Sequence, residues 1–396
     1  MYPASSSPSR RLPRLFAIEA MAAHASNLLM LGIFFYMHQH FGWGSLRNLM
    51  LSCSQGCVYV LGALSSSYLS LQMGRRRLLR ALSTAMAVFV VIGACWANAA
   101  VIVVVLLCYT FLCATQWPAL ESLICDGAGA EELARRTNLY NMNWAFVGSI
   151  TVAASGTIIE YFPRGIFLLA ALAHISCALL LRVIADAPPA APVHADPEPQ
   201  LLVVRTLAMR LSRIALPATY AVLYAIGALM PTLPTIRALD PQMRTLVGSV
   251  WMMARFPTFA FLTVTIWWHT RPRALVAANA MLLIAFLGVT IPLFHSLSFN
   301  LAVMIGAQIV LGTAMGLIYS ASLYFGMVLS EGSTEHGGYH EALIGLGSML
   351  GPGAGALAQS LYPQSPSAGI AAVAVLLGIS VAAASVFSLA NSPAES

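Results

Sequence analysis

Residues 339–355 read YHEALIGLGSMLGPGAG and combine charge with glycine in one apolar run. The ionisable pair His340–Glu341 opens the run, and Pro352 stands among the glycines that follow. Three of these glycines recur at four-residue spacing: Gly347, Gly351 and Gly355. Glycines at this spacing fall near one face of a helix and let another backbone approach closely. The stretch therefore predicts a membrane helix that packs tightly, bends, and carries an ionisable group into the protein.

The composition indicates an integral membrane protein. Of the 396 residues, 59% are hydrophobic and only 9% are charged, whereas soluble domains carry about 25% charged residues. The net charge of +6 comes from arginines that cluster beside apolar runs, as topology signals do. The charge therefore does not indicate a nucleic-acid partner.

Twelve apolar stretches are long enough to cross a bilayer, which takes about 20 residues per helix. We expect an all-α membrane protein whose spans lie at 15–40, 46–71, 76–97, 99–125, 137–161, 163–185, 212–236, 243–269, 273–294, 298–328, 338–361 and 367–390. Between the sixth and seventh spans, the proline-rich and acidic sequence DAPPAAPVHADPEPQ cannot form a membrane helix. The predicted organisation is a six-helix bundle (1–185), a cytoplasmic linker (186–211) and a second six-helix bundle (212–396).

The arginines predict the orientation in the membrane. With the N-terminus inside, fifteen of the 20 basic residues lie in cytoplasmic segments, four lie on the opposite side, and Arg255 lies within a span. Positive charge favours the cytoplasmic side. We therefore expect a multi-pass protein of a bacterial inner membrane with both termini in the cytoplasm.

The second half of the chain repeats the first. A shift of 199 residues aligns Tyr140–Asn141 with Tyr339–His340, Gly148–Ser149 with Gly347–Ser348, and Gly156 with Gly355. These matches all fall in the fifth span of each half. They indicate a pseudo-symmetric pair of bundles.

The chain resembles the major facilitator superfamily over essentially its whole length. Besides the six-plus-six layout, the loop after the second span ends in Gly74–Arg75–Arg76–Arg77, similar to the end of the family signature G-x-L-x-D-R-x-G-R-R. Leu71 stands where that signature has the Asp that tethers helix ends across the halves. The glycines around Pro352 resemble the Gly-Pro motif of the family's antiporters, here in the eleventh span instead of the fifth. The resemblance implies conformational or packing roles for Gly74, Arg75, Gly347, Gly351, Pro352 and Gly355.

Arg255 lies near the middle of the eighth span, far from either membrane surface. A charge at this depth is costly and is usually functional. It predicts an anchor for an anionic group of a substrate or a partner for a titrating carboxylate. A structural ion pair with a neighbouring helix is the alternative.

Ionisable and polar residues near the cytoplasmic ends of several spans are candidates for coupling or substrate contact. A carboxylate that faces a partly dry cavity can exchange a proton during transport, so the proton-carrier candidates are Glu19, Glu121, His340 and Glu341. Capping of the first helical turn by Glu341, and pairing of Glu19 or Glu121 with loop arginines, are the alternatives. Further candidates for substrate contact are Asn27, Asn141 and Tyr319, for which helix packing is the alternative.

Enzyme motifs are missing from the sequence. It has no G-x-x-x-x-G-K-[ST] loop for ATP and no H-E-x-x-H zinc motif, so we expect no enzymatic activity, cofactor or metal site. The resemblance implies a secondary active transporter that moves a small organic solute by alternating access. Its expected partners are the solute, a proton or other coupling ion and the lipid bilayer, and we expect a monomer. The alternatives are a lipid or lysolipid flippase of the same fold, and a non-transporting membrane sensor or assembly factor.

Overall fold

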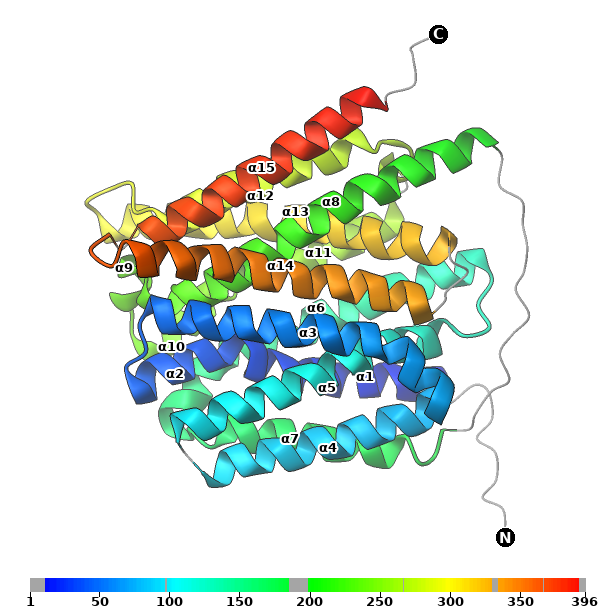
Figure 1. The fold of residues 1–396 in the computed structure, drawn as a ribbon, viewed down its shortest axis with the longest axis horizontal. Helices are drawn as coiled ribbons and strands as arrows, with labels where there is room; N and C mark the ends of the chain where they lie inside the picture. The colour runs from blue at the N-terminus through cyan, green and yellow to red at the C-terminus, as the bar shows by residue number, and fades with distance from the viewer. Residues whose placement is uncertain are drawn as a thin grey trace.

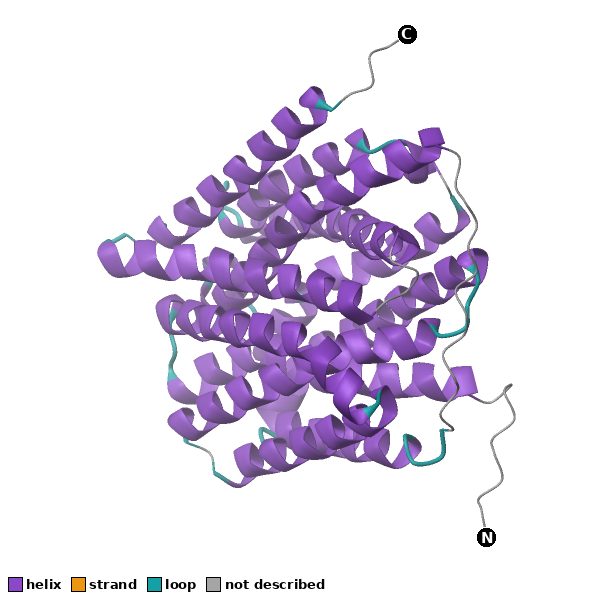
Figure 2. Ribbon diagram, turned by 45° about the vertical axis from the view of Figure 1, so that its right-hand side comes forward, coloured by secondary structure: helices purple, strands orange, loops and turns teal. Residues whose placement is uncertain are grey.

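The structure of the protein, a computed structural model, is a bundle of helices. It describes residues 11–96, 98–184, 199–265, 267–329, 334–365 and 367–391. These residues contain no strand (Figure 2). Ten of their helical segments are long and apolar enough to cross a membrane. Two further helices, of 16 and 28 residues, make the fold compatible with the twelve predicted spans. The prediction of an all-α membrane protein is confirmed.

The first half of the chain begins with one long, irregular passage. The helical segments of this half are α1 (Arg11–Asn27), the π-helix η2 (Leu28–Gly32), α2 (Ile33–Phe41), α3 (Ser45–Met73), α4 (Arg75–Cys95), α5 (Ala99–Cys125), α6 (Ala130–Tyr161) and α7 (Gly165–Leu180). The segments α1, η2 and α2 run on as a single passage of 31 residues. It ends at Gly42, whose φ of 63° is the left-handed conformation that glycine adopts most easily at a helix C-terminus.

The second half has the same arrangement of spans, but its helices are interrupted more often. Its helical segments are α8 (Pro199–Leu229), η3 (Met230–Thr232), α9 (Pro234–Arg237), α10 (Pro241–Gly248), α11 (Val250–Val264), η4 (Trp267–Thr270), α12 (Arg273–Thr290), α13 (Leu297–Leu329), α14 (Thr334–Leu361) and α15 (Ala368–Ala390). Helix α8 begins inside the range predicted for the linker, so the last residues of that range extend the seventh span. Residues 186–198 of the predicted linker lie outside the described residues.

The two halves meet along equivalent helices. Helix α14 packs along α3, and α6 packs along α10 and α11 (Figure 1). The 199-residue repeat aligns α6 with α14, so the two contacts are related by the internal symmetry of the chain. The described chain starts and finishes at the same end of the bundle (Figure 1), as an even number of passages requires. We call this end, where α4 begins at Arg75, the arginine-rich end.

The glycines of α14 allow two backbones to approach it closely. A Cβ atom at Gly347 would stand 2.2 Å from the carbonyl oxygen of Pro217, and one at Gly351 would stand 2.4 Å from that of Ala221. Both contacts are with α8 of the same half. Gly355 meets nothing closer than 3.4 Å, at Leu49 on α3 among others. The four-residue spacing drifts about 40° per step because a turn takes 3.6 residues, so the third glycine faces away from α8.

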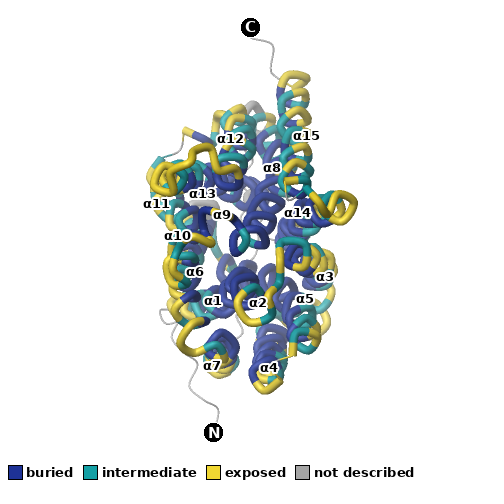
Figure 3. The backbone as a smooth tube through the Cα atoms, turned by 90° about the vertical axis from the view of Figure 1, so that its left-hand side faces the viewer, coloured by how far each residue is buried: buried dark blue, intermediate teal, exposed yellow. Residues whose placement is uncertain are grey.

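Apolar side chains are exposed on the outer faces of the bundle, where lipid surrounds a membrane protein. The residues between the helices are buried, and the exposed ones lie at the periphery (Figure 3). Examples of exposed apolar side chains are Val88 on α4, Leu172 on α7 and Val386 on α15. Polar side chains that could bind a solute are therefore those inside the bundle.

Candidate functional site

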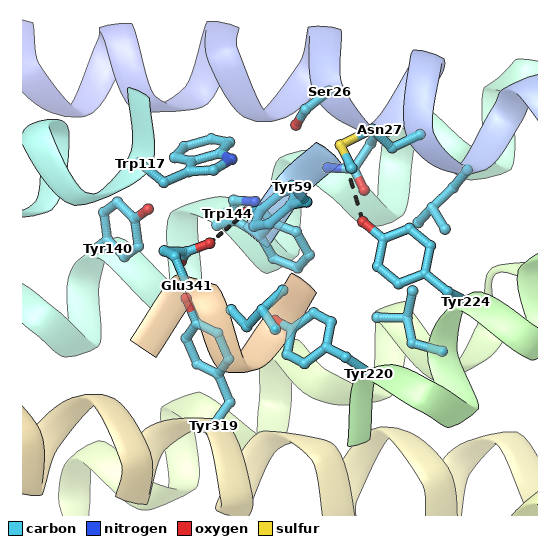
Figure 4. Close-up of a pocket in the computed structure, with 14 residues that line it drawn as sticks. Ser26, Asn27, Tyr59, Trp117, Tyr140, Trp144, Tyr220, Tyr224, Tyr319 and Glu341 are labelled. Atoms are coloured by element: carbon cyan, nitrogen blue, oxygen red, sulfur yellow. Dashed lines mark hydrogen bonds between the residues drawn. The ribbon is translucent and has the colours of Figure 1, made fainter. Parts of the chain in front are cut away.

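A small cavity of about 50 Å³ lies where the two halves meet (Figure 4). Its lining is rich in aromatic rings and includes one carboxylate, that of Glu341. The lining residues are Ser26, Asn27, Met30, Leu31, Tyr59, Trp117, Tyr140, Trp144, Tyr220, Leu223, Tyr224, Tyr319, Glu341 and Ile344. They come from both halves, so the cavity depends on how the halves sit against each other.

Local helix geometry brings these side chains to the cavity. Met30 and Leu31 belong to the π-helix η2, and single π-turns inside α-helices occur frequently at functional sites. On α8, Tyr220 and Tyr224 lie four residues apart and therefore share a helix face. The first passage and α8 thus both supply side chains to the wall of the cavity (Figure 4).

A hydrogen bond joins the two halves in the cavity wall. The phenol of Tyr59, on α3, donates to Oε2 of Glu341, on α14 (Figure 4). Both side chains are buried. Burying an ionised carboxylate is costly unless its charge is compensated, so proton uptake or release by Glu341 changes the free energy of this contact.

Arg255, on α11, lies inside a cage of aromatic rings. Its Cζ atom is 4.9 Å from the centroid of Trp144, 5.4 Å from those of Phe259 and Tyr319, and 6.0 Å from that of Trp251. Each such cation–π contact stabilises the charge by about 0.5–2 kcal/mol. Among the described residues, Nε and Nη1 have no hydrogen-bond partner and no carboxylate forms an ion pair with this side chain.

The cage shares a wall with the cavity. Trp144 and Tyr319 contact the guanidinium of Arg255 and also line the cavity. The unpartnered Nε and Nη1 of Arg255 thus belong to a side chain that two rings of the cavity lining cover. The arrangement can therefore receive an anionic or strongly accepting group of a solute.

Glu121, on α5, is buried at the contact with the other half. Neither of its carboxylate oxygens has a hydrogen-bond partner among the described residues. Its Oε2 lies 3.4 Å from the position that a Cβ atom of Gly337 would take. Gly337 is in the first turn of α14, and a helix N-terminus favours a nearby negative charge. An ionised Glu121 would therefore strengthen the contact between α5 and α14.

Glu19, on α1, acts within the first half. Its Oε2 accepts a hydrogen bond from Nδ2 of Asn143, on α6, and the same amide donates to the carbonyl oxygen of Phe16 over 3.0 Å. Its other oxygen has no partner among the described residues. The carboxylate is fully buried and does not line the cavity.

The remaining predicted site residues lie in three different surroundings. His340 is 3.0 Å from Oγ of Ser322 through Nδ1, and its ring packs edge-on against Tyr319. Asn27 lines the cavity and donates to the carbonyl oxygen of Ala23 over 2.8 Å. Asn141 is buried, and its amide has no partner among the described residues.

The structure thus brings together a part of the predicted set. Glu341, Asn27 and Tyr319 line the cavity. Arg255 and His340 contact Tyr319 from outside the lining. The other predicted residues, Glu19, Glu121 and Asn141, are buried away from the cavity surface.

Sequence reasoning missed four tyrosines of the lining: Tyr59, Tyr140, Tyr220 and Tyr224. A phenol inside a membrane span needs a hydrogen-bond partner, and two phenols four residues apart form a recognisable signal on α8. Tyr59 offers no such signal, because its partner is 282 residues away in the chain.

The loop between α3 and α4 is tethered within the first half. Gly74 has a φ of 77° there. Arg75 donates to Oγ of Ser122 over 2.8 Å and lies 3.3 Å from Oδ2 of Asp126, which Arg11 also approaches to 3.2 Å. Leu71, at the position of the signature Asp, is 83% exposed and makes no tether across the halves.

The comparisons with known proteins agree with this architecture. Residues 15–352 match the family model for the Major Facilitator Superfamily. The chain belongs to the major facilitator superfamily. No curated protein matches the sequence.

Among solved structures, the chain is similar to the crystal structure of a mutant of the nucleoside transporter NupG. The TM-score is 0.64 at 14% sequence identity, over 96% of this chain and 99% of that one. At this identity the similarity shows the fold alone. Membership of the superfamily confirms the predicted fold and makes the protein a multi-pass membrane transporter of the secondary class.

Proposed function

We propose that this superfamily member is a proton-coupled transporter that moves a small organic solute by alternating access. The observation that carries the proposal is the hydrogen bond between Tyr59 and Glu341. It places a buried carboxylate both in the cavity wall and at the contact between the halves. A change in the protonation of Glu341 would thereby alter solute binding and the closure of the halves together.

The small size of the cavity supports a transport cycle in which the two halves move relative to each other. About 50 Å³ holds a few water molecules, whereas pockets for organic ligands have about 300–1,000 Å³. An organic solute therefore needs the halves to separate. The arginine-rich end would face the cytoplasm, because most of the positive charge gathers there.

The lining suggests the chemistry of the solute. Aromatic rings favour stacking with a flat ring system, and the guanidinium of Arg255 favours an anionic or accepting substituent. The solved structure similar to this chain is that of a nucleoside transporter. A flat heterocycle with polar substituents is the proposed solute class, with nucleosides as its first members to test.

The proposal is tested with purified protein in two steps. Thermal shifts measured with nucleosides, aromatic acids, sugars and amino acids identify a ligand. That ligand is then offered to proteoliposomes containing a pH-sensitive dye. We expect ligand-driven proton movement in the wild type and at least tenfold less in Glu341→Gln.

Glu132→Gln is the matched control, because Glu132 lies outside the membrane spans and pairs with Arg135 and Arg136. It should move protons like the wild type. Unchanged proton movement in Glu341→Gln would remove this carboxylate from the mechanism. Translocation of labelled lipid without solute uptake would support a flippase instead.

A further inference from the structure

A groove on the outer face of the first half ends in positive charge. It has a volume of about 410 Å³ and lies between α4 and α7, which pack side by side (Figure 1). Thr84 and Arg182 form the polar end of the groove. The rest of its lining is apolar and consists of Ala87, Val88, Val91, Ile92, Ile175, Ala178 and Leu179. From Thr84 to Ile92 the groove runs for about 12 Å along α4, at 1.5 Å per residue.

Two arginines of α4 continue the polar end of the groove. Arg77 and Arg80 lie seven and four residues before Thr84, which places all three on the same helix face. The hydroxyl of Thr84 bonds the backbone carbonyl of Arg80 over 2.9 Å. The residues that follow α7 also reach the start of α4, because Arg76 donates to the carbonyl oxygen of Ile184.

These basic side chains are not neutralised within the described part of the protein. Arg77, Arg80 and Arg182 are exposed, and none forms an ion pair with a described acidic residue. Asp126, an acidic side chain at the same end of the first half, pairs with Arg11 and Arg75. Basic pockets between membrane helices at the cytoplasmic side bind anionic lipid head groups.

We propose that this groove is a binding site for an anionic phospholipid. One acyl chain lies between α4 and α7 against Val88, Val91 and Leu179, and the phosphate is held by Arg182 and Arg80. The acyl chain of such a lipid matches the apolar lining of the groove, and its negatively charged phosphate complements the basic end of the groove. Neither feature is used by the transport cavity between the halves.

A second groove on the second half provides an internal comparison. It has about 580 Å³ and lies between α11 and α13, lined by Val250, Met253, Ala254, Pro257, Thr258, Phe261, Ile309 and Thr313. It is larger than the first groove but contains no charged residue. Lipids should bind in this groove through their acyl chains, whatever head group they carry.

The test is native mass spectrometry of the detergent-purified full chain, titrated with phosphatidylglycerol and with phosphatidylcholine. We expect phosphatidylglycerol to be retained in preference to phosphatidylcholine. Each of Arg80→Gln and Arg182→Gln should weaken its retention about fivefold, and the double variant about thirtyfold. Arg47→Gln, an exposed arginine at the opposite end, is the charge-matched control and should change nothing.

A second pair of variants tests the acyl chain. Ala178→Leu fills the first groove and should reduce phosphatidylglycerol binding, whereas Thr313→Leu fills the second and should leave it unchanged. Glycerol phosphate, which has the charge without the chain, should not compete at millimolar concentration. Equal retention of both lipids, or unaltered phosphatidylglycerol binding in the double arginine variant, would overturn the proposal.

Discussion

Arg255 combines two properties that rarely coexist in a membrane helix. It is almost fully buried, and its charge is surrounded by rings with no ion-pair partner in the described residues. Replacing a poorly compensated buried charge with an apolar group of similar length is often neutral or stabilising. If the residue serves solute binding, its removal should affect binding far more than folding.

We therefore predict that Arg255→Met melts at the wild-type temperature or above it, while uptake and the ligand-induced thermal shift are lost. Arg255→Lys should bind weakly as well, because a lysine keeps the charge without the planar stacking group. Melting temperature in detergent and uptake into proteoliposomes measure the two effects. A large fall in melting temperature with normal uptake would instead make Arg255 a structural residue.

His269 lies outside the membrane spans, because the eighth span ends at Val264 and not at the predicted residue 269. It gives the protein a predictable response to pH. Burial, with a smaller effect of Arg205, lowers the pKa of His269 to about 4, and its ring stacks on Tyr324 at 4.4 Å. An unfolded histidine takes up a proton near pH 6.5. The unfolded state therefore binds more protons between pH 6.5 and 4, so stability falls as the pH falls through this window.

We predict that His269→Phe melts closer to its pH 7 temperature at pH 5 than the wild type does. The phenylalanine keeps the stacking on Tyr324 and removes the titration. Melting curves at the two pH values measure the difference. An identical pH dependence in both proteins would exclude this histidine as its source.

At the residue scale, sequence reasoning found the charges and missed their surroundings. Arg255 could be singled out because an intramembrane charge is costly wherever it points. Half of its cage could have been predicted, since Trp251 and Phe259 lie four residues to either side on α11 and share its helix face. The other half could not, because Trp144 and Tyr319 belong to other helices and their approach depends on packing across the bundle. Tyr59 was missed for the same reason: only its contact with Glu341 distinguishes it from a packing residue.

At the scale of the element, α14 depends on the absence of side chains at two positions. The carbonyl oxygens of Pro217 and Ala221 occupy the places where Cβ atoms of Gly347 and Gly351 would stand. A methyl group there must push α8 away. Overpacking of this kind costs about 1–3 kcal/mol per site.

We predict that Gly347→Ala and Gly351→Ala each lower the melting temperature and the yield of folded protein. Gly355→Ala is the matched control, because its Cβ would make only ordinary contacts at 3.4 Å. It should be at least as stable as the wild type, since alanine favours the helix over glycine by about 1 kcal/mol. Equal effects of all three substitutions would show that close contact with α8 is not what requires glycine.

The sequence predicted the existence of the elements more reliably than their ends. The repeated glycines correctly indicated a closely packed helix, because small residues have the same consequence in any bundle. Helix α8 begins at Pro199, thirteen residues before the predicted span at 212. Hydropathy detects the part of a helix that lipid surrounds, whereas a helix can extend into water as long as its backbone hydrogen bonds continue.

At the scale of the whole molecule, hydrogen bonds between the halves concentrate, within the described residues, at the end opposite the arginine-rich one. There Ser45 and Gln359 exchange hydrogen bonds of 3.1 and 2.7 Å. Asn48 donates to the carbonyl oxygen of Ala228 over 3.3 Å, and Thr245 donates to that of Ala153 over 3.0 Å. If the transporter works by alternating access, these contacts have to break in one half of the cycle.

A reversible cross-link tests this requirement. In a cysteine-free background that retains uptake, Ser45→Cys and Gln359→Cys are joined by a short bifunctional methanethiosulfonate, which attaches to each cysteine through a reducible disulfide. We predict that cross-linking stops uptake and that a reducing agent restores it, because α3 and α14 can no longer separate at this end. The variant without reagent should transport the solute.

The control pair lies within one half. Asn279, on α12, donates to Oγ of Ser380, on α15, over 3.0 Å, so Asn279→Cys and Ser380→Cys can be joined by the same reagent. Rigid-body movement of the two halves leaves this distance unchanged, and the cross-linked control should therefore keep its uptake. Full uptake with the Ser45–Gln359 cross-link in place would show that this end stays closed during transport. Loss of uptake in both cross-linked pairs would mean that the second half itself deforms, and the two bundles could not then be treated as rigid units.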